Sequence, residues 1–418
     1  MSDLPYHPVD GGVCAAKGFQ ASALSCGIKN PDSDRLDLAL LYSEHPCRSH
    51  GMFTQNRVKA APVRVTQAHQ RAEDLRAVVV NSGNANACTG PNGMRDARIM
   101  AKIPAKSLGL RQREVGVCST GVIGLPLPMS RIEPHLAELK DGLSAANGNT
   151  FARSIITSDT HEKEIAISFE LEGVTVTIGG CVKGAGMIHP NMATMLGFIT
   201  TDLAVSKACL QRLTEEAVND SFNRVSVDGD TSTNDTVLVM ANGAAGNKEL
   251  KQTSKAFAEV KHALTYVMLR LAKAIVRDGE RVTKFVTVTV KGARLARDAR
   301  KAANAVIQSQ LVKCSWNGED PNWGRIIHAV GYSGAGIREE LIDISFNDLL
   351  ACANGLQAET DPEELRKVVQ QDEFTITIDL NRGQASHTLY TSDLSPEYVD
   401  FNRSEYAYWK QAKSDGLI

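Results

Sequence analysis

Hydrophobic and polar residues alternate with a period of two in several short stretches of this chain, which is the pattern of half-buried β-strands. Residues 164–178, EIAISFELEGVTVTI, alternate on both sides of Glu172-Gly173 and predict a hairpin with its turn at that pair. Residues 374–391 repeat the pattern around Asn381-Arg-Gly383 and predict a second hairpin. Other strand-like runs are 36–43, 76–81, 114–118, 234–240, 284–290, 341–346 and 373–379.

Helical spacing of apolar residues appears in longer stretches, at 206–219, 253–277 and 295–310. In the second stretch one apolar stripe recurs at helical spacing, formed by Phe257, Val260, Leu264, Val267, Leu271 and Ile275. Because the strands come partly in hairpins and partly between helices, their order favours a layered α/β fold of the α+β type, with mixed sheets between helices. We expect a subdomain boundary near 285–300, after the long helix.

Composition and charge indicate an ordinary globular protein. The 418 residues (45.1 kDa) are enough for two or three domains with a sizeable core. A net charge of −2 argues against nucleic acid or an anionic membrane surface as partner. With no apolar run of about 18 residues and no secretory pattern at the N-terminus, we expect a cytoplasmic protein without a membrane span. The nine cysteines include no CxxC pair, which indicates reduced thiols.

One acidic stretch, residues 228–235 (DGDTSTND), offers oxygen atoms of the kind that bind Mg²⁺ or Ca²⁺. The alternative is a polar turn whose Asp, Ser and Thr side chains bond to their own backbone. We favour the turn and predict no metal site, because Mg²⁺ sites usually draw carboxylates from several segments. The common nucleotide-binding, zinc-protease, calcium-loop and serine-hydrolase motifs do not occur in the sequence.

Thr194 lies in an unusual run, residues 184–196 (GAGMIHPNMATML), and is a candidate nucleophile. A threonine hydroxyl reacts poorly unless a base takes its proton. If the peptide bond before Thr194 is cut, the new α-amino group lies on the same residue, and its ordinary pKa of about 7.7–8.0 suits a general base. Ala193 leaves its carbonyl unhindered, and Gly184 and Gly186 permit unusual backbone conformations. From these residues alone, self-cleavage and a buried strand threonine both stay open.

Residues 183–196, KGAGMIHPNMATML, resemble the self-processing segment of the ornithine acetyltransferases, the bifunctional glutamate N-acetyltransferases of arginine biosynthesis. The resemblance extends from about residue 10 to about residue 400, through further blocks in the order of that family. These blocks are 16–21 (AKGFQA), 26–29 (CGIK), 81–87 (NSGNANA), 118–124 (CSTGVIG), 156–160 (ITSDT), 223–230 (NRVSVDGD), 277–280 (RDGE) and 320–325 (DPNWGR).

The resemblance implies autocatalytic cleavage between Ala193 and Thr194. The fragments would hold residues 1–193 and 194–418, and would stay together as a heterotetramer with two copies of each. It also implies a fold with a smaller C-terminal subdomain. In the family's reaction the freed threonine, an N-terminal nucleophile, takes acetyl from N-acetylornithine and passes it to glutamate. Thr120 and Gly121 would stabilise the oxyanion of each half-reaction.

Substrate contacts implied by the resemblance fall on Thr157, Lys183, Glu280 and Asn402, in addition to Thr194. A lysine suits a substrate carboxylate, and a glutamate suits the ammonium of ornithine. Two departures concern substrate choice rather than the nucleophile. Arg281-Val282 replaces a small pair. After Asn402 the family usually ends within a few residues, in a tyrosine and a pair of small hydroxyl residues, whereas here residues 403–409 (RSEYAYW) follow and the chain continues to Ile418.

Other functions remain open at this point. An N-terminal-nucleophile amidohydrolase or aminopeptidase would use the same chemistry with water as acceptor. A metal-dependent phosphohydrolase would use the 228–235 loop, and an unprocessed binding protein would keep the pocket without the cut. No cofactor is expected, and acetyl-CoA as a co-substrate stays open.

Overall fold

The structure is a computed structural model that describes residues 6–189, 195–403 and 405–414. The predicted cleavage site, Ala193 and Thr194, therefore lies outside the described residues. Within those residues, no helix is long and apolar enough to cross a membrane.

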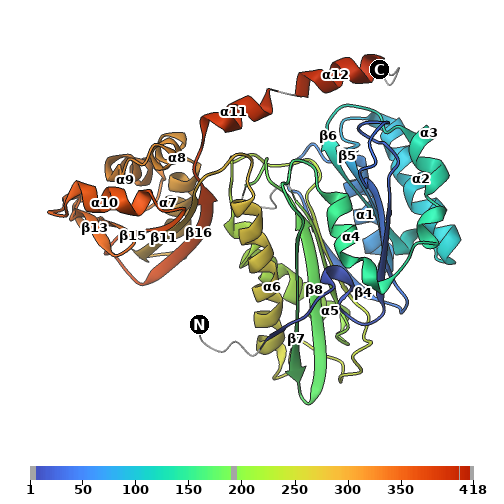
Figure 1. The fold of residues 1–418 in the computed structure, drawn as a ribbon. Coiled ribbons are helices and arrows are strands. Elements are labelled where there is room, and N and C mark those ends of the chain that lie inside the picture. Colours follow the sequence, from blue (N-terminus) through green and yellow to red (C-terminus); the bar gives the residue numbers. More distant parts are fainter. Residues whose placement is uncertain (1–5, 190–194, 404, 415–418) are drawn as a thin grey trace.

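Two mixed sheets pack face to face in the larger part of the molecule (Figure 1). The central sheet has the order β1 (His7–Pro8), β7 (Lys163–Leu171), β8 (Val174–Lys183), β9 (Leu196–Thr201), β10 (Thr236–Ala241) and β4 (Arg48–Phe53). The N-terminal sheet has the order β2 (Phe19–Leu24), β3 (Leu38–Ser43), β5 (Ala77–Asn84) and β6 (Val115–Val122). Neighbours are mostly antiparallel, but β9–β10 and β5–β6 are parallel.

The central sheet is buried on both faces, and its sequence shows this directly. In β10, Leu238 and Met240 face the N-terminal sheet, whereas Val237 and Val239 face the helices on the other side. Because successive side chains of a strand point to opposite faces, a strand covered on both sides is apolar throughout. The result is a helix–sheet–sheet–helix stack, which confirms the predicted layered α/β fold with mixed sheets.

Helices cover both outer faces of the stack. On the central sheet lie α5 (Lys207–Asn219) and α6 (Phe257–Arg277), and the predicted stripe of α6 packs into that core. On the N-terminal side lie α1 (Ala61–Ala72), α2 (Gly90–Leu108) and α3 (Met129–Ile132), and α4 (Gly148–Ile155) packs between the sheets. The expected hairpin at Glu172-Gly173 is confirmed, because Leu171 pairs with Val174 across that turn.

A smaller C-terminal subdomain carries its own sheet and its own core, which begins at Val286. Its strand order is β14 (Leu356–Gln357), β13 (Leu349–Ala353), β12 (Asp343–Phe346), β15 (Glu373–Asp379), β11 (Phe285–Ala293) and β16 (Ala385–Ser392). Its helices are α7 (Ala296–Gln308), α8 (Gln310–Asn317), α9 (Trp323–Tyr332) and α10 (Pro362–Val369).

The predicted hairpin at 374–391 is wrong. β15 and β16 are not neighbours, because β11 lies between them, parallel to β15 and antiparallel to β16. The connecting loop instead crosses the end of β11, where the N–H groups of Leu380 and Arg382 donate to the carbonyls of Lys291 and Gly292. Period-two alternation identifies a strand but not its partner, and β11 supplies pairing on both of its edges.

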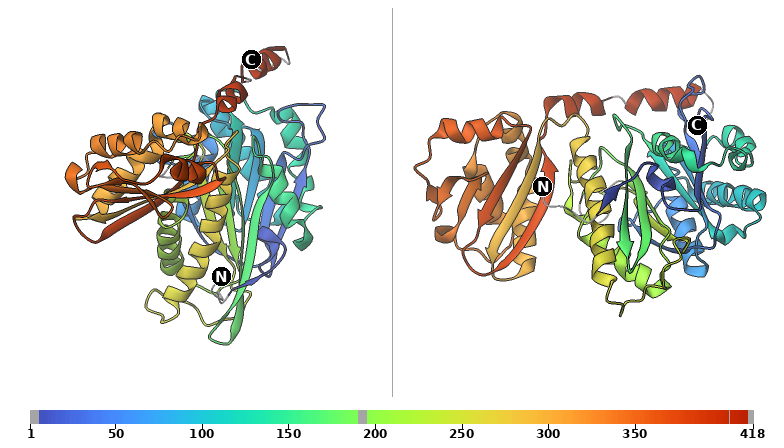
Figure 2. Two further views of the ribbon diagram at one scale, coloured as in Figure 1. Left: turned by 60° about the vertical axis from the view of Figure 1, so that its left-hand side comes forward. Right: turned by 60° about the horizontal axis from the view of Figure 1, so that its bottom comes forward.

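The chain ends in two helices that return toward the larger part of the molecule. Figures 1 and 2 show α11 (Pro396–Asn402) and α12 (Glu405–Ser414) running from the C-terminal subdomain to the end of β6. There Ala412 packs with Val122 and Leu125. The ends of β6 and β8, the loop after α6 and the helix α11 thereby meet in one place.

Candidate active site

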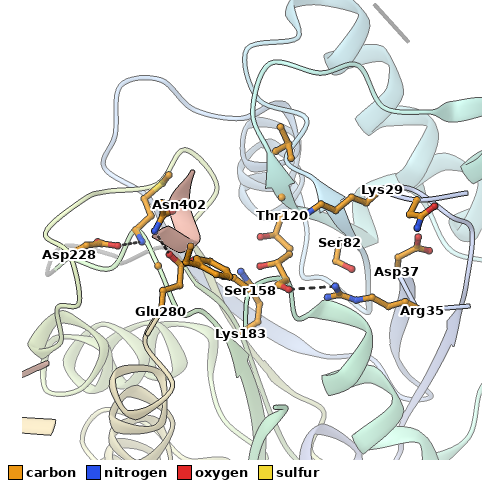
Figure 3. A pocket seen from close by; sticks show the side chains of 18 of the residues that line it. Lys29, Arg35, Asp37, Ser82, Thr120, Ser158, Lys183, Asp228, Glu280 and Asn402 are labelled. Atoms are coloured by element: carbon orange, nitrogen blue, oxygen red, sulfur yellow. Dashed lines mark hydrogen bonds between the residues drawn. The ribbon is translucent and has the colours of Figure 1, made fainter. Parts of the chain in front are cut away.

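A cavity of about 700 Å³ lies where these segments meet (Figure 3). It brings together every predicted site residue that the structure describes, namely Thr120, Gly121, Thr157, Lys183, Glu280 and Asn402. These residues come from β6, the loop after α4, β8, the loop after α6 and α11. The predicted nucleophile Thr194 and its neighbour Ala193 lie outside the described residues.

Thr120 and Gly121 lie near the end of β6, and a close backbone approach requires the glycine. Gly121 has a φ of +131°, and a Cβ at this position would lie 2.2 Å from the carbonyl carbon of Gly83 in β5. Only glycine fits such a position without strain. Thr120 is buried while Gly121 is exposed to the cavity. This places a hydroxyl and a backbone N–H next to each other in a fixed strand.

Lys183, the last residue of β8, belongs to a buried network of charges. Its ammonium lies 3.9 Å from the carboxylate of Asp159, which also accepts a hydrogen bond from Lys163 at 2.7 Å. Burial alone would raise the pKa of Asp159, but Lys183 and Lys163 hold it below its ordinary value. Burial lowers the pKa of Lys183, while Asp159 opposes that shift. The network keeps a cation at the cavity wall that a substrate carboxylate can approach.

Asp159 also fixes the backbone around the cavity. Its carboxylate accepts the N–H of Thr157 at 3.0 Å and the N–H of Gly184 at 2.7 Å. One buried side chain therefore positions the loop that carries Thr157 and the start of the glycine-containing segment after β8. The block 156–160 drew attention in the sequence, but nothing in a single sequence identifies its aspartate as the shared partner of Lys163 and the more distant Lys183.

Glu280 faces the second glycine of this segment. A Cβ on Gly186 would lie 2.5 Å from the Glu280 carboxyl group, so a larger residue there would displace this carboxyl group. The N–H of Glu280 donates to the carbonyl of Ala185 at 2.9 Å, and its carboxylate accepts from the amide of Asn402 at 3.1 Å. Glu280 and Asn402 form one polar wall of the cavity (Figure 3).

The acidic stretch 228–235 forms the expected polar turn. The carboxylate of Asp228 accepts the N–H groups of Ile188 and Asp230, at 2.8 Å and 3.2 Å, and the N–H of Asn234 donates to the hydroxyl of Ser232 at 3.0 Å. Asp228 also accepts the hydroxyl of Tyr398 at 3.2 Å, and burial together with this carboxylate raises the pKa of Tyr398. The stretch thus ties residues 187–188 to the C-terminal helix α11.

Comparisons with known proteins identify the family of this chain. The sequence pattern of the ArgJ family matches residues 20–407. The chain belongs to the ArgJ family. It is 50% identical over 387 residues to the arginine biosynthesis bifunctional protein ArgJ of Geobacter sulfurreducens, which covers 92% of this chain and 98% of that protein.

A second protein of the same name, from Symbiobacterium thermophilum, is 48% identical over 394 residues, covering 94% of this chain and 98% of that protein. Among solved structures, the arginine biosynthesis bifunctional protein ArgJ of Bacillus halodurans is 38% identical. The alignment has a TM-score of 0.49 and covers 50% of this chain and 99% of that one.

Charged side chains of both signs line this ArgJ cavity, an arrangement that the sequence did not reveal. Lys29, Arg35 and Asp37 lie at one end, and Asp228 and Glu280 lie at the other (Figure 3). Lys29 and Asp228 lie in blocks that resemble the family, but only the fold places them in one cavity. Arg35 lies in no such block, and its guanidinium donates to the carbonyl of Ile156. Cations and carboxylates in one cavity suit small substrates that carry both signs.

Arg281 and the described residues after Asn402, where the sequence is predicted to depart from the family pattern, lie near the cavity. Arg281 has a positive φ of 56°, and its guanidinium lies 4.9 Å from the ring centroid of Phe401 in α11. Residues 405–414 form α12, whose Trp409 lies against Gly124, close to the strand end that carries Thr120 and Gly121. Helix α12 of this ArgJ chain therefore packs beside the strand that carries Thr120 and Gly121.

Proposed function

We propose that this ArgJ family member transfers acetyl from N-acetylornithine to glutamate in arginine biosynthesis, through an acetyl-threonine intermediate on Thr194. The observation that carries the proposal is the convergence of six family-matched residues, from separate segments, on one cavity. The names of the curated relatives, arginine biosynthesis bifunctional proteins, support the pathway.

The first proposed step is autocatalytic cleavage. The Oγ of Thr194 attacks the carbonyl carbon of Ala193, a C–O bond forms, the C–N bond breaks, and the nitrogen takes the hydroxyl proton. Water then hydrolyses the resulting ester, which leaves the carboxylate of Ala193 and a Thr194 with a free hydroxyl and a free α-amino group. Nucleophile and general base then lie on one residue.

Acetyl transfer follows in two half-reactions. The α-amino group takes the Oγ proton as Oγ attacks the acetyl carbonyl, ornithine leaves with that proton, and Thr194 carries the acetyl ester. The amine of glutamate then attacks the ester and restores the hydroxyl. The Thr120 hydroxyl and the Gly121 N–H would donate hydrogen bonds to the oxyanion in both half-reactions. Each donor would lower the activation free energy by about 3 kcal/mol. Lys183 would bind a substrate carboxylate, and Glu280 an ammonium, with Thr157 and Asn402 completing the contacts.

The two fragments are proposed to stay associated after the cut. In the central sheet β8 pairs with β9, and β4 pairs with β10, so the two strands from residues 194–418 are hydrogen-bonded on both sides to strands from residues 1–193. Separating them would expose the core that both sheets share. Assembly as two copies of each fragment is the accompanying expectation, and native mass spectrometry tests it.

A denaturing mass spectrum of the purified protein tests the cleavage. We expect two species whose boundary lies between Ala193 and Thr194, and a single uncut, inactive chain for Thr194→Ala. Normal turnover by the alanine variant would contradict the mechanism.

An assay with N-acetylornithine and glutamate tests the transfer. We expect ornithine and N-acetylglutamate in equal amounts, whereas ornithine with free acetate would indicate an amidohydrolase. Replacing N-acetylornithine with acetyl-CoA in the same assay shows whether the protein accepts a second acyl donor.

A further inference from the structure

The stretch before β10 contacts both halves of the proposed active site, and Asn234 contacts the first half. Its side-chain amide donates to the carbonyl of Ala85 at 2.7 Å and to the carbonyl of Ser119 at 2.8 Å. Ser119 directly precedes Thr120, and its carbonyl belongs to the peptide unit that also contains the N–H of Thr120. Asn234 is buried, so these bonds form away from water. Asn234 thus fixes the peptide that leads into the candidate oxyanion pair.

The next residue, Asp235, fixes the other half. Its carboxyl oxygen Oδ1 accepts the N–H of Met195 at 3.1 Å, and the N–H of Thr236 donates to the Met195 carbonyl at 3.1 Å. Both polar groups of the Met195 backbone are therefore held from one place. The Met195 N–H belongs to the peptide bond that follows Thr194 in the sequence.

Two consecutive residues reach different segments from the stretch that leads into β10. The Asn234 side chain contacts Ala85, directly after β5, and Ser119 in β6. The Asp235 side chain contacts Met195, directly before β9. The dipeptide therefore connects the N-terminal sheet with the start of β9.

The carboxyl group of Asp235 is buried without a full set of hydrogen bonds from the described part of the chain. It is fully buried, and among the described residues its second oxygen, Oδ2, has no hydrogen-bond partner. Burial raises its pKa well above the ordinary value, and the Met195 N–H and Lys183 oppose that shift. A buried carboxyl oxygen without a partner costs stability, so this residue is disadvantageous unless it contributes elsewhere.

We propose that Asn234 and Asp235 are a positioning pair, which holds the oxyanion strand and the peptide after the nucleophile in fixed register with each other. The inference rests on the proposed function, because it assigns the pair to the Thr194 chemistry. Neither residue lines the cavity, so both act through the groups that they orient. Cleavage and acetyl transfer use the same nucleophile and the same oxyanion donors, so the pair serves both.

The test compares Asp235→Ala with a matched control, Asp202→Ala. Asp202 follows the other end of β9, is equally buried, and accepts the N–H of Thr177 at 2.8 Å. Both substitutions remove a buried carboxyl that holds a backbone N–H of the central sheet, but only one lies at the site. Cleavage of the full chain is followed by mass spectrometry after cell-free synthesis, and kcat and KM are measured on the matured protein.

We expect Asp235→Ala and Asn234→Ala each to slow cleavage and lower kcat by at least about tenfold, since small misplacements of reacting groups have effects of that order. KM should stay within about threefold. Asp235→Asn should restore most of both rates, because its amide oxygen can still accept the Met195 N–H. Asp202→Ala should lower the melting temperature while leaving kcat nearly unchanged.

Equal losses of kcat in Asp202→Ala and Asp235→Ala, or no rescue by Asp235→Asn, would overturn the inference while leaving the proposed function intact. If Asp235→Ala does not fold, Asn234→Ala and Asp235→Asn carry the same comparison. A wild-type chain that neither cleaves nor transfers acetyl would instead overturn the proposed function, and the inference with it.

Discussion

Lys183 and Lys313 are buried to the same extent, each with 3% of its surface exposed, but in different surroundings. Lys183, at the cavity, lies beside the carboxylate of Asp159. Lys313, in α8 of the C-terminal subdomain, donates to the hydroxyl of Thr391 at 3.0 Å and to the carbonyl of Ser392. Burial lowers the pKa of both lysines, to about 8 for Lys313. A buried cation with a lowered pKa is therefore not by itself a sign of a functional site.

The partners of each lysine make the difference. Lys313 donates its hydrogen bonds to oxygens of its own subdomain and does not itself line the cavity. Lys183 is 3.9 Å from Asp159, beyond hydrogen-bond distance, whereas Lys163 satisfies that carboxylate at 2.7 Å. Lys313 satisfies oxygens within its own subdomain. Lys183 presents its charge to the cavity, because Lys163 already pairs with the Asp159 carboxylate.

Exchanging each lysine for methionine should separate these roles. For Lys183→Met we expect kcat/KM to fall about 100-fold, because a buried charge that pairs with a ligand is worth a few kcal/mol. Stability should change little, since Lys163 still neutralises Asp159. For Lys313→Met we expect kcat/KM within about twofold of wild type and a change confined to stability. Steady-state kinetics and thermal melting on both variants check this, and equal kinetic losses would contradict it.

Sequence patterns predicted many of the strands and the long helices, but not which strands are neighbours in a sheet. The stripe of α6 and the turn at Glu172-Gly173 follow from local spacing, which a single sequence contains. The partner of β15 does not, because β11 comes from far away in the chain. The same limit applies to the site. Thr120, Lys183 and Glu280 were identified through family blocks, but the role of Asp159 depends on contacts between segments.

Helices α1, α2 and α4 were also missed, and the reasons are local. α2 contains Pro104 and begins among glycines, so its helical period is interrupted, and α4 has only eight residues. Short or interrupted helices depend on tertiary packing more than on their own periodicity. Here the packing partner of α4 is the shared core of the two sheets, which becomes visible only in the structure.

Removing α12 should show how far the C-terminal subdomain reaches into the pocket region. A chain that ends at Arg403 loses Ala412, which packs with Val122 and Leu125, and loses Trp409 against Gly124. Losing roughly 1 kcal/mol of apolar contact beside the cavity should raise KM about fivefold. Cleavage should still occur, and the melting temperature should fall only slightly. Kinetics and melting of the truncated chain check this. Loss of cleavage would show that α12 is needed for maturation instead.

The last prediction concerns Lys313 and the pH dependence of stability, with no expected effect on turnover. Its pKa is about 8 in the folded protein and 10.5 in an ordinary environment. Between these values the unfolded chain binds a proton that the folded protein does not, so the free energy of unfolding should rise with pH in this window and level off above it. The rise is on the order of 3 kcal/mol, at about 1.4 kcal/mol per pH unit.

Lys183, which is present in both wild type and Lys313→Met, contributes a slope of the same sign to each. The informative quantity is therefore the difference in the free energy of unfolding between wild type and Lys313→Met. Chemical denaturation at pH 7.5 to 10.5 should give a steeper rise for wild type, and parallel curves would show that Lys313 stays charged in the folded protein. In that case the oxygen atoms around Lys313 would offset the effect of burial on its pKa. Lys183 and Lys313 would then differ only in that Lys183 lines the cavity.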